Sequence, residues 1–207
     1  MAEFVLVGGG GHARVVLDAL VRLGHHVVGY AAPSPEDARV DVPYLGRDED
    51  VLGLLDASGL DAVLGLGKTR VDDGRMRLLA GYEAAGFRFP AIVAPSATVH
   101  PDVDLGAASI VLDGAVVVTG SKLGRGCIVN TNASVDHDCL LGENVHVAPG
   151  ATVCGDVGIA AGCLVGAGST LVPGIRVCAG VLIAAGATVA SDITEPGTYR
   201  GTPARRV

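Results

Sequence analysis

The sequence predicts an α/β domain followed by a parallel β-helix, and three observations carry that prediction. Segments typical of strands and of helices alternate through the first 92 residues. From Val93 onward, Val, Leu or Ile opens sixteen consecutive hexads without a slip in phase. Hydrophobic residues make up 49% of the chain but aromatic residues only 3%, so the core must consist of aliphatic side chains in regular layers. The expected domains are 1–92 and 93–193, with a tail at 194–207 that leaves the repeat.

The first domain is expected to hold a parallel sheet. Buried strands are expected at 3–8, 25–30, 61–67 and 88–93, and helices at 12–24, 48–59 and 75–86. The segment 31–43, rich in Pro, Ala and Asp, is typical of a loop. Strands that alternate with helices indicate crossover connections, so we expect a Rossmann-like domain.

A glycine-rich turn, "VGGGGHARVV", follows the first strand and has the G-x-G-x-x-A spacing of a dinucleotide site, a weak signal alone. An NAD site needs an acidic residue at the end of the second strand, and that strand ends "VVGYAAP". Glycines let the backbone approach a phosphate that the following helix start attracts, so a nucleotide diphosphate is favoured over NAD. The candidate contacts are Gly9, Gly10, Gly11 and His12. His12 could donate a hydrogen bond, or be a simple capping or surface residue.

The hexad repeat predicts the geometry of the second domain. Three hexads make one triangular turn, so residues about 18 apart stack and the repeat gives about five coils. First-position aliphatic and fifth-position small residues are expected to point inward, with the third and fourth positions at the corners. Each coil contacts only its neighbours, so both ends need a cap. We expect the α/β domain to cap one end and the tail 194–207 the other.

His137 occupies the third position of the hexad "VDHDCL", an outward corner. An outward histidine is ordinarily a solvated surface residue. Here Asp138 adjoins it and could hold one ring nitrogen, which fixes the tautomer and favours the imidazolium formed on proton capture. Asn130 on the preceding hexad and His146 on the following one bring further polar groups to this level of the coil. His137 is therefore the candidate general base.

Composition argues against several classes of function. The net charge of −7, without a basic run, argues against a nucleic-acid partner. No stretch of about 18 apolar residues suggests a membrane span, and the first residues lack the features of a signal peptide. Five cysteines without CxxC pairing fit a reducing compartment. We expect a cytoplasmic protein with no metal site.

Four features together resemble one family: "GGGGH" after the first strand, the unbroken hexads, "NTNASVDHDC", and the terminal "GTPAR". Over essentially its whole length the chain resembles the sialic-acid O-acetyltransferase-like group of hexapeptide-repeat transferases, which includes bacterial nucleotide-sugar N-acetyltransferases. These enzymes acetylate the 4-amino group of UDP- or GDP-linked dideoxy sugars. The resemblance implies a left-handed β-helix, although the general rule for crossovers would favour a right-handed one. It also implies a homotrimer with each active site between adjacent β-helices.

The resemblance also implies residue roles. The catalytic histidine of the family falls on His137, the acidic residue that supports it on Asp138, and an asparagine seven residues earlier on Asn130. Contacts to acetyl-CoA fall on His146, Gly155, Ala167 and Ala185. The last three are tiny outward residues, which leave room for a pantetheine arm along the coil.

The chain departs from the family pattern at the predicted nucleotide site. Many relatives place aspartates after the second strand, where residues 30–32 are Tyr, Ala and Ala. The third strand ends with Gly67, Lys68 and Thr69, where relatives often have Asn or Asp at the last two. Gly67 and Lys68 remain candidate substrate contacts, and the base and sugar stay open.

The function expected from the sequence is acetyl-CoA-dependent N-acetylation of a nucleotide-linked amino sugar, a 4-amino-4,6-dideoxy sugar, by direct transfer. Cys139 occupies an inward fifth position, where a buried thiol has little thiolate, so an acyl-cysteine route is disfavoured. Two alternatives remain. One is O-acetylation of sialic acid or another hydroxyl acceptor, and the other is a non-catalytic nucleotide-sugar-binding β-helix protein.

Overall fold

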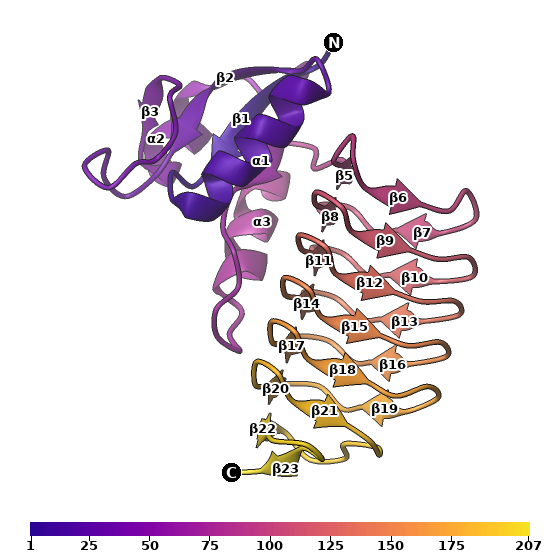
Figure 1. Ribbon diagram of the computed structural model, residues 1–207. Helices are drawn as coiled ribbons and strands as arrows, with labels where there is room; N and C mark the ends of the chain where they lie inside the picture. Colours follow the sequence, from indigo (N-terminus) through magenta and orange to yellow (C-terminus); the bar gives the residue numbers. More distant parts are fainter. The chain divides into compact units, whose positions relative to one another are not determined.

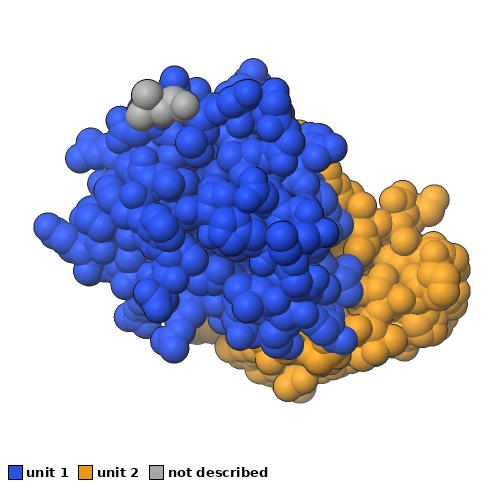
Figure 2. Space-filling model, turned by 90° about the horizontal axis from the view of Figure 1, so that it is seen from above, with its two compact units in different colours: residues 1–67, 74–95 blue, residues 68–73, 96–207 orange. Residues whose placement is uncertain are grey.

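A computed structural model describes residues 1–207, except for the side chain of Leu54. The chain divides into two compact units, coloured separately in Figure 2. The first unit comprises residues 1–67 and 74–95, and the second comprises 68–73 and 96–207. The segment 68–73, here called the strap, therefore leaves the first unit and belongs with the β-helix.

The first unit contains a four-stranded parallel sheet with the strand order β3-β2-β1-β4. Figure 1 labels β1, β2 and β3 of this sheet. Its strands are β1 (Glu3–Val7), β2 (His26–Ala31), β3 (Tyr44–Gly46) and β4 (Leu60–Leu64), and its helices are α1 (Gly11–Arg22), α2 (Asp48–Leu54) and α3 (Gly74–Ala84). The central strand β1 is apolar from Phe4 to Val7 and fully buried there, as a strand covered on both faces must be. The predicted α/β domain is confirmed.

Three details of the first unit differ from the prediction. Helix α2 ends at Leu54, whereas it was expected to continue to residue 59. The edge strand β3 was missed, because three residues are too few to show a period. The strand expected at 88–93 was wrong: Arg88 makes only an isolated bridge with Asp61, and strand geometry is limited to Ile92–Val93 (β5), outside the four-stranded sheet. Pro90 has no N–H to donate to a ladder, which explains the interruption.

The second unit is a left-handed parallel β-helix whose short strands stack into three faces (Figure 1). Face I contains β8 (Ile110–Val111), β11 (Ile128–Val129), β14 (His146–Val147), β17 (Leu164–Val165) and β20 (Val181–Ile183). Face II contains β6 (Thr98–Val99), β9 (Val116–Val117), β12 (Ser134–Val135), β15 (Thr152–Val153), β18 (Thr170–Leu171) and β21 (Thr188–Val189). Face III contains β7 (Asp104–Leu105), β10 (Lys122–Leu123), β13 (Leu140–Leu141), β16 (Gly158–Ile159) and β19 (Arg176–Val177). Paired residues are 18 apart, as in Ser134 with Thr152, so the predicted register is confirmed.

The interior of the coil follows the hexad phase. First-position residues such as Val135 and Val153 are fully buried. Fifth-position hydroxyl and thiol groups also point inward and bond to carbonyl groups 15 residues further on. Ser121 Oγ donates to Asp136 O at 2.7 Å, and Cys139 Sγ contacts Cys154 O at 3.1 Å. At the fifth position, a small side chain with a hydrogen-bond donor therefore bonds to a backbone carbonyl that has no partner within the strand ladders.

The corners depend on a left-handed residue at the fourth position of each hexad. From residue 108 to residue 186, every fourth position has a positive φ. Most are glycine, and the exceptions are Ala108, Asn132, Asp138, Asn144 and Asp156. Asn and Asp tolerate this conformation better than other side chains. An aspartate can therefore stand directly at a corner, next to a third-position side chain that faces solvent.

The tail extends face I and then reverses. Strand β22 (Gly197–Arg200) pairs in parallel with β20, and β23 (Arg205–Arg206) pairs with β22 in the antiparallel sense. This hairpin occupies the edge of face I at the end of the stack. Of the helices that the structure describes, none is long and apolar enough to span a bilayer.

Candidate functional site

A histidine–aspartate pair stands at the corner between faces II and III. His137 follows β12, and its Nδ1 lies 2.9 Å from Oδ2 of Asp138. The two side chains are 55% and 67% exposed. Because a carboxylate accepts hydrogen bonds, Nδ1 carries the proton in the neutral imidazole and Nε2 keeps its lone pair. The pair therefore has the geometry of a general base with its orienting carboxylate.

Two glycines on adjacent coils make room for this pair. Gly120 lies one coil before Asp138, and a Cβ there would overlap Asp138 Oδ1. Gly155 lies one coil after His137, and a Cβ there would overlap the imidazole at Nε2. The imidazole thus rests against the backbone of the next coil. Gly155 was predicted to make room for pantetheine, and in the structure its missing side chain makes room for His137. Gly120 was missed, although its 18-residue offset from Asp138 could have revealed it.

The electrostatic surroundings make His137 more basic. Its pKa is raised above the usual value of 6.5, first by the hydrogen bond to Asp138 and further by the negative charges of Asp136, Asp138 and Asp156, while desolvation opposes the shift. Cys139 is fully buried, and burial raises the pKa of its thiol. At this corner the imidazole has a proton-accepting nitrogen, whereas the neighbouring thiol is held inert inside the coil.

His146 lies in a different environment from the one expected for an outward contact. It is buried on face I, where its Nδ1 lies 2.8 Å from the Lys68 carbonyl oxygen on the strap and its Nε2 lies 3.1 Å from Asn130 Nδ2. The carbonyl must accept, so Nδ1 carries the proton and Nε2 accepts from Asn130. Asn130 Oδ1 in turn accepts from the Thr131 N–H at 2.8 Å. The imidazole therefore links the strap to the corner between faces I and II.

The predicted acetyl-CoA contacts are divided between two corners. Gly155 lies with His137 at the corner between faces II and III. Ala167 and Ala185 are exposed and stack at the corner between faces I and II, on the same side as Asn130, with the Gly186 N–H donating to Ala167 O at 2.9 Å. The expected gathering of polar groups at one level of the coil therefore spans two corners. Within one chain, the structure does not bring Asn130, Ala167 and Ala185 to His137.

The predicted sugar-nucleotide contacts of the first unit follow two adjacent parallel strands. Gly9 to His12 follow β1 and Gly67 follows β4, and the two segments approach where a Cβ on Gly67 would lie 3.4 Å from His12 Cβ. Gly10 is the N-cap of α1, a position with no side-chain hydrogen bond to the helix. The Arg39 N–H donates to Gly9 O at 2.7 Å and holds the loop from one side.

Lys68 belongs to the strap instead. It is buried, and its Nζ donates to the Asp72 carbonyl at 3.2 Å. Its assignment as a substrate contact stays a prediction. Across the described residues, no group of three or more His, Cys, Asp or Glu side chains is placed to hold a metal ion.

Comparisons with known proteins match both parts of the chain. Residues 3–73 match the model of the PglD N-terminal domain, and residues 120–155 match the bacterial transferase hexapeptide (six repeats) model. A curated relative, the bifunctional protein GlmU of Syntrophotalea carbinolica, is 28% identical over 126 residues. That match covers 60% of this chain and 25% of the relative, so the chain spans about a quarter of the length of GlmU.

Solved structures match the chain along its whole length. The acetyltransferase domain of PglB from Neisseria gonorrhoeae, in complex with acetyl coenzyme A, is 33% identical and has a TM-score of 0.93, with 99% of this chain and 98% of that chain covered. PerB from Caulobacter crescentus, in complex with CoA and GDP-perosamine, is 32% identical with a TM-score of 0.89, covering 99% and 97%. WeeI from Acinetobacter baumannii, 19% identical over 99% of both chains with a TM-score of 0.86, shows the same fold.

Proposed function

The chain belongs to the hexapeptide-repeat transferases that carry a PglD-type N-terminal domain, and we propose that it is an acetyl-CoA-dependent N-acetyltransferase. The proposed acceptor is the amino group of a nucleotide-linked sugar, a 4-amino-4,6-dideoxy sugar. One observation carries the proposal: the solvent-exposed corner pair in which Asp138 fixes the tautomer of His137. Full-length similarity to an acetyltransferase domain solved with acetyl coenzyme A supports it.

In the proposed reaction, the sugar amine attacks the thioester carbonyl of acetyl-CoA directly. Nε2 of His137 takes the proton that the amine nitrogen loses as the C–N bond forms. Asp138 holds the Nδ1–H and stabilises the resulting imidazolium. The C–S bond then breaks, the imidazolium returns the proton to the departing thiolate, and the products are the acetamido sugar nucleotide and CoA. No acyl-cysteine forms, because Cys139 has neither access nor thiolate character.

The two separated corners become adjacent if copies of the chain surround a threefold axis with face II inward. The outward column of face II consists of Thr98, Val116, Ser134, Thr152, Thr170 and Thr188, all uncharged. In such a ring, the His137 corner of one chain meets the corner with Asn130, Ala167 and Ala185 of the next. We therefore propose a homotrimer in which acetyl-CoA lies between neighbouring β-helices.

The glycine loop after β1 is the proposed site of the nucleotide diphosphate. A Cβ added at Gly10 or at Gly11 would meet no heavy atom within 4 Å, so the loop leaves space for a close approach. The start of α1 directs backbone N–H groups toward that space. All five cysteines are free, which fits the proposed cytoplasmic location.

The test is release of CoA thiol from acetyl-CoA with a panel of acceptors. The panel contains UDP-, GDP- and dTDP-linked 4-amino sugars, CMP-sialic acid and free sialic acid. We expect turnover only with amino sugars. Turnover only with hydroxyl acceptors would make the protein an O-acetyltransferase, and nucleotide binding without any thiol release would make it a non-catalytic binding protein.

Calorimetry on two variants tests the placement of the substrates. Gly10→Val fills the loop where the diphosphate is proposed, and should weaken sugar-nucleotide binding while leaving the Kd for CoA within about threefold. Ala167→Trp fills the proposed pantetheine path and should do the reverse. If Gly10→Val abolished CoA binding and spared the nucleotide, the placement of the two substrates would be wrong.

A further inference from the structure

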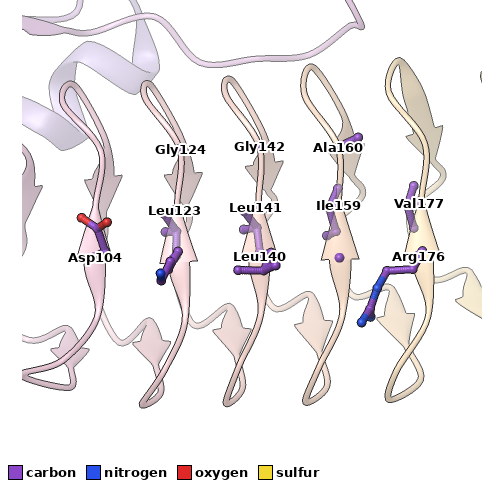
Figure 3. Close-up of a pocket in the computed structure, with 12 residues that line it drawn as sticks. Asp104, Leu123, Gly124, Leu140, Leu141, Gly142, Ile159, Ala160, Arg176 and Val177 are labelled. Carbon is purple, nitrogen blue, oxygen red and sulfur yellow. The ribbon is translucent and has the colours of Figure 1, made fainter.

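Arg176 reaches from its own coil back to the preceding one. It lies on face III in β19, and Figure 3 shows its side chain extending toward the neighbouring coil. Nη2 lies 2.9 Å from Oδ1 of Asp156, and Nη1 donates to the Asp156 carbonyl. Gly158 leaves the path open, because a Cβ there would lie 2.7 Å from Arg176 Cδ. The guanidinium thus holds both the carboxylate and the backbone of one corner residue.

The corner that Arg176 holds is the one against which the imidazole of His137 rests. Asp156 directly follows Gly155, whose missing side chain accommodates the ring. The Asp156 N–H also donates to the carbonyl of His137 at 2.9 Å. A displacement of this corner would therefore move both the backbone and the ring of His137.

The backbone of Arg176 is itself fixed by the chain that follows the last coil. Its N–H donates to Asp192 Oδ1 at 2.9 Å, and its carbonyl accepts from the Ile193 N–H at 2.9 Å. Arg176 is therefore anchored at its backbone by residues 192–193 and at its guanidinium by Asp156. A residue held at both ends in this way is suited to fixing the position of the residues that it contacts.

We propose that Arg176 is a positioning residue for His137: it pins the Gly155–Asp156 corner beneath the imidazole and neutralises the Asp156 carboxylate. The proposal rests on the function proposed above, in which His137 is the base. Arg176 touches neither His137 nor Asp138 in the contacts that the structure shows, so it acts through Asp156.

The charges around His137 set the sign of the expected effect. Asp136 and Asp138 belong to its own corner, and Asp156 faces it from the following coil. The preceding coil presents Thr119 and Gly120, which both donate to Asp102 Oδ2, while the Thr119 N–H also contacts His100 Nδ1. Negative charge at Asp156 raises the pKa of His137. Loss of the compensating guanidinium should raise it further, so the base would be protonated up to a higher pH.

The experiment compares four variants and one control variant by NMR titration of the His137 ring and by the pH profile of kcat/KM. Arg176→Gln should move the titration midpoint and the acidic limb to higher pH and lower kcat by about 3- to 10-fold, with KM for acetyl-CoA unchanged. Asp156→Asn should move the midpoint to lower pH. The double variant should return the midpoint toward that of the wild type, because both charges are gone.

Arg176→Lys separates charge from geometry. It keeps the positive charge but cannot bond the carboxylate and the carbonyl with one planar fork. The midpoint should therefore stay near that of the wild type while kcat falls as in Arg176→Gln. Lys122→Gln is the matched control, because Lys122 occupies the same outward column of face III on an earlier coil and should change neither readout.

Two outcomes would overturn the inference. One is an Arg176→Gln protein whose midpoint and kcat both match those of Lys122→Gln. The other is an Asp156→Asn protein with an unchanged midpoint, which decides the matter even if Arg176→Gln does not fold. Failure of the proposed function would look different: no acceptor would be acetylated, or His137→Ala would be fully active, while the NMR titration would still report the link between Arg176 and His137.

Discussion

Two histidines nine residues apart have opposite surroundings. His137 is half exposed at the corner between faces II and III, and its Nδ1 lies 2.9 Å from a carboxylate oxygen. His146 is 7% exposed on face I, and its two ring nitrogens contact a carbonyl and an amide. A carboxylate partner at one nitrogen leaves the other basic and accessible, whereas a carbonyl and an amide together occupy both. The ring of His137 is therefore suited to proton transfer, and the ring of His146 to holding the strap.

The largest effect should come from His137→Ala. Removal of a positioned general base should lower kcat/KM by about 10²- to 10⁴-fold. The fold should persist, because an outward corner residue supports no core. Acetyl-CoA turnover at neutral pH and circular dichroism check both statements. His26→Ala, at an exposed histidine bonded to Glu3, is the matched control and should retain full activity.

Gly155→Ala should have the next largest effect. The added methyl group would overlap the imidazole and displace it from the attacking amine, which should lower kcat by about 10²-fold. Gly81→Ala is the control for adding a methyl group, because the new Cβ would meet no heavy atom within 4 Å outside the backbone of its own helix α3. Full activity in Gly155→Ala would mean that the position of the ring against this corner is irrelevant to turnover.

Asp138→Asn should make His137 a weaker base while leaving the imidazole in place. Asn also tolerates the left-handed corner, so the backbone should be retained. Loss of the carboxylate lowers the pKa of His137, because the hydrogen bond to Asp138 is the main cause that raises it. The acidic limb of kcat/KM should therefore move to lower pH, with kcat reduced by about 10-fold. An unmoved limb would show that Asp138 does not support the base.

His146→Phe should reverse the pattern, with a loss of stability and little loss of turnover. The Lys68 carbonyl and the Asn130 amide would lose their partner, which costs about 1–3 kcal/mol in the free energy of unfolding. Hydrogen exchange should accelerate across the strap, residues 68–73, while kcat changes by less than about threefold. A large rise in KM for acetyl-CoA at unchanged stability would instead make His146 a cofactor contact. The contrast between a catalytic His137 and a structural His146 would then be wrong.

Cys139→Ala should have the smallest effect on catalysis. The thiol is buried, so kcat per folded molecule should stay near that of the wild type, with about 1 kcal/mol of stability lost. Rapid quenching with radiolabelled acetyl-CoA provides the check. A kinetically competent acetyl group on this cysteine would overturn direct transfer.

The hexads predicted most side-chain positions in the second unit, because the place of a residue within its hexad decides whether its side chain points inward or lies at a corner. Val135 is inside and His137 at a corner by phase alone, and the structure places both accordingly. The handedness came from family resemblance, since a six-residue period is the same in either hand. The corners could also have been separated by counting, because Asn130 follows a face I strand and His137 a face II strand.

Other features required contacts that no local pattern encodes. The strap joins the β-helix through Lys68 and Asp72, which bond to His146 and Asn144 more than 70 residues later. The role of Gly155 depends on the side chain of a residue one coil earlier. The prediction of strands failed at two short segments for a different reason. Strand β3 has only three residues, and the segment 88–93 is apolar enough for a strand but is interrupted by Pro90.

Whether His137 is the base is tested most directly by the pH profile of kcat/KM for wild type and His137→Ala with the best amino-sugar acceptor. For the wild type, we expect the rate to fall below a midpoint above pH 6.5, because the pKa of His137 is raised and the protonated ring cannot accept a proton. The variant should be slow at every pH and lack this limb. Equal rates, or the same limb in the variant, would contradict the assignment.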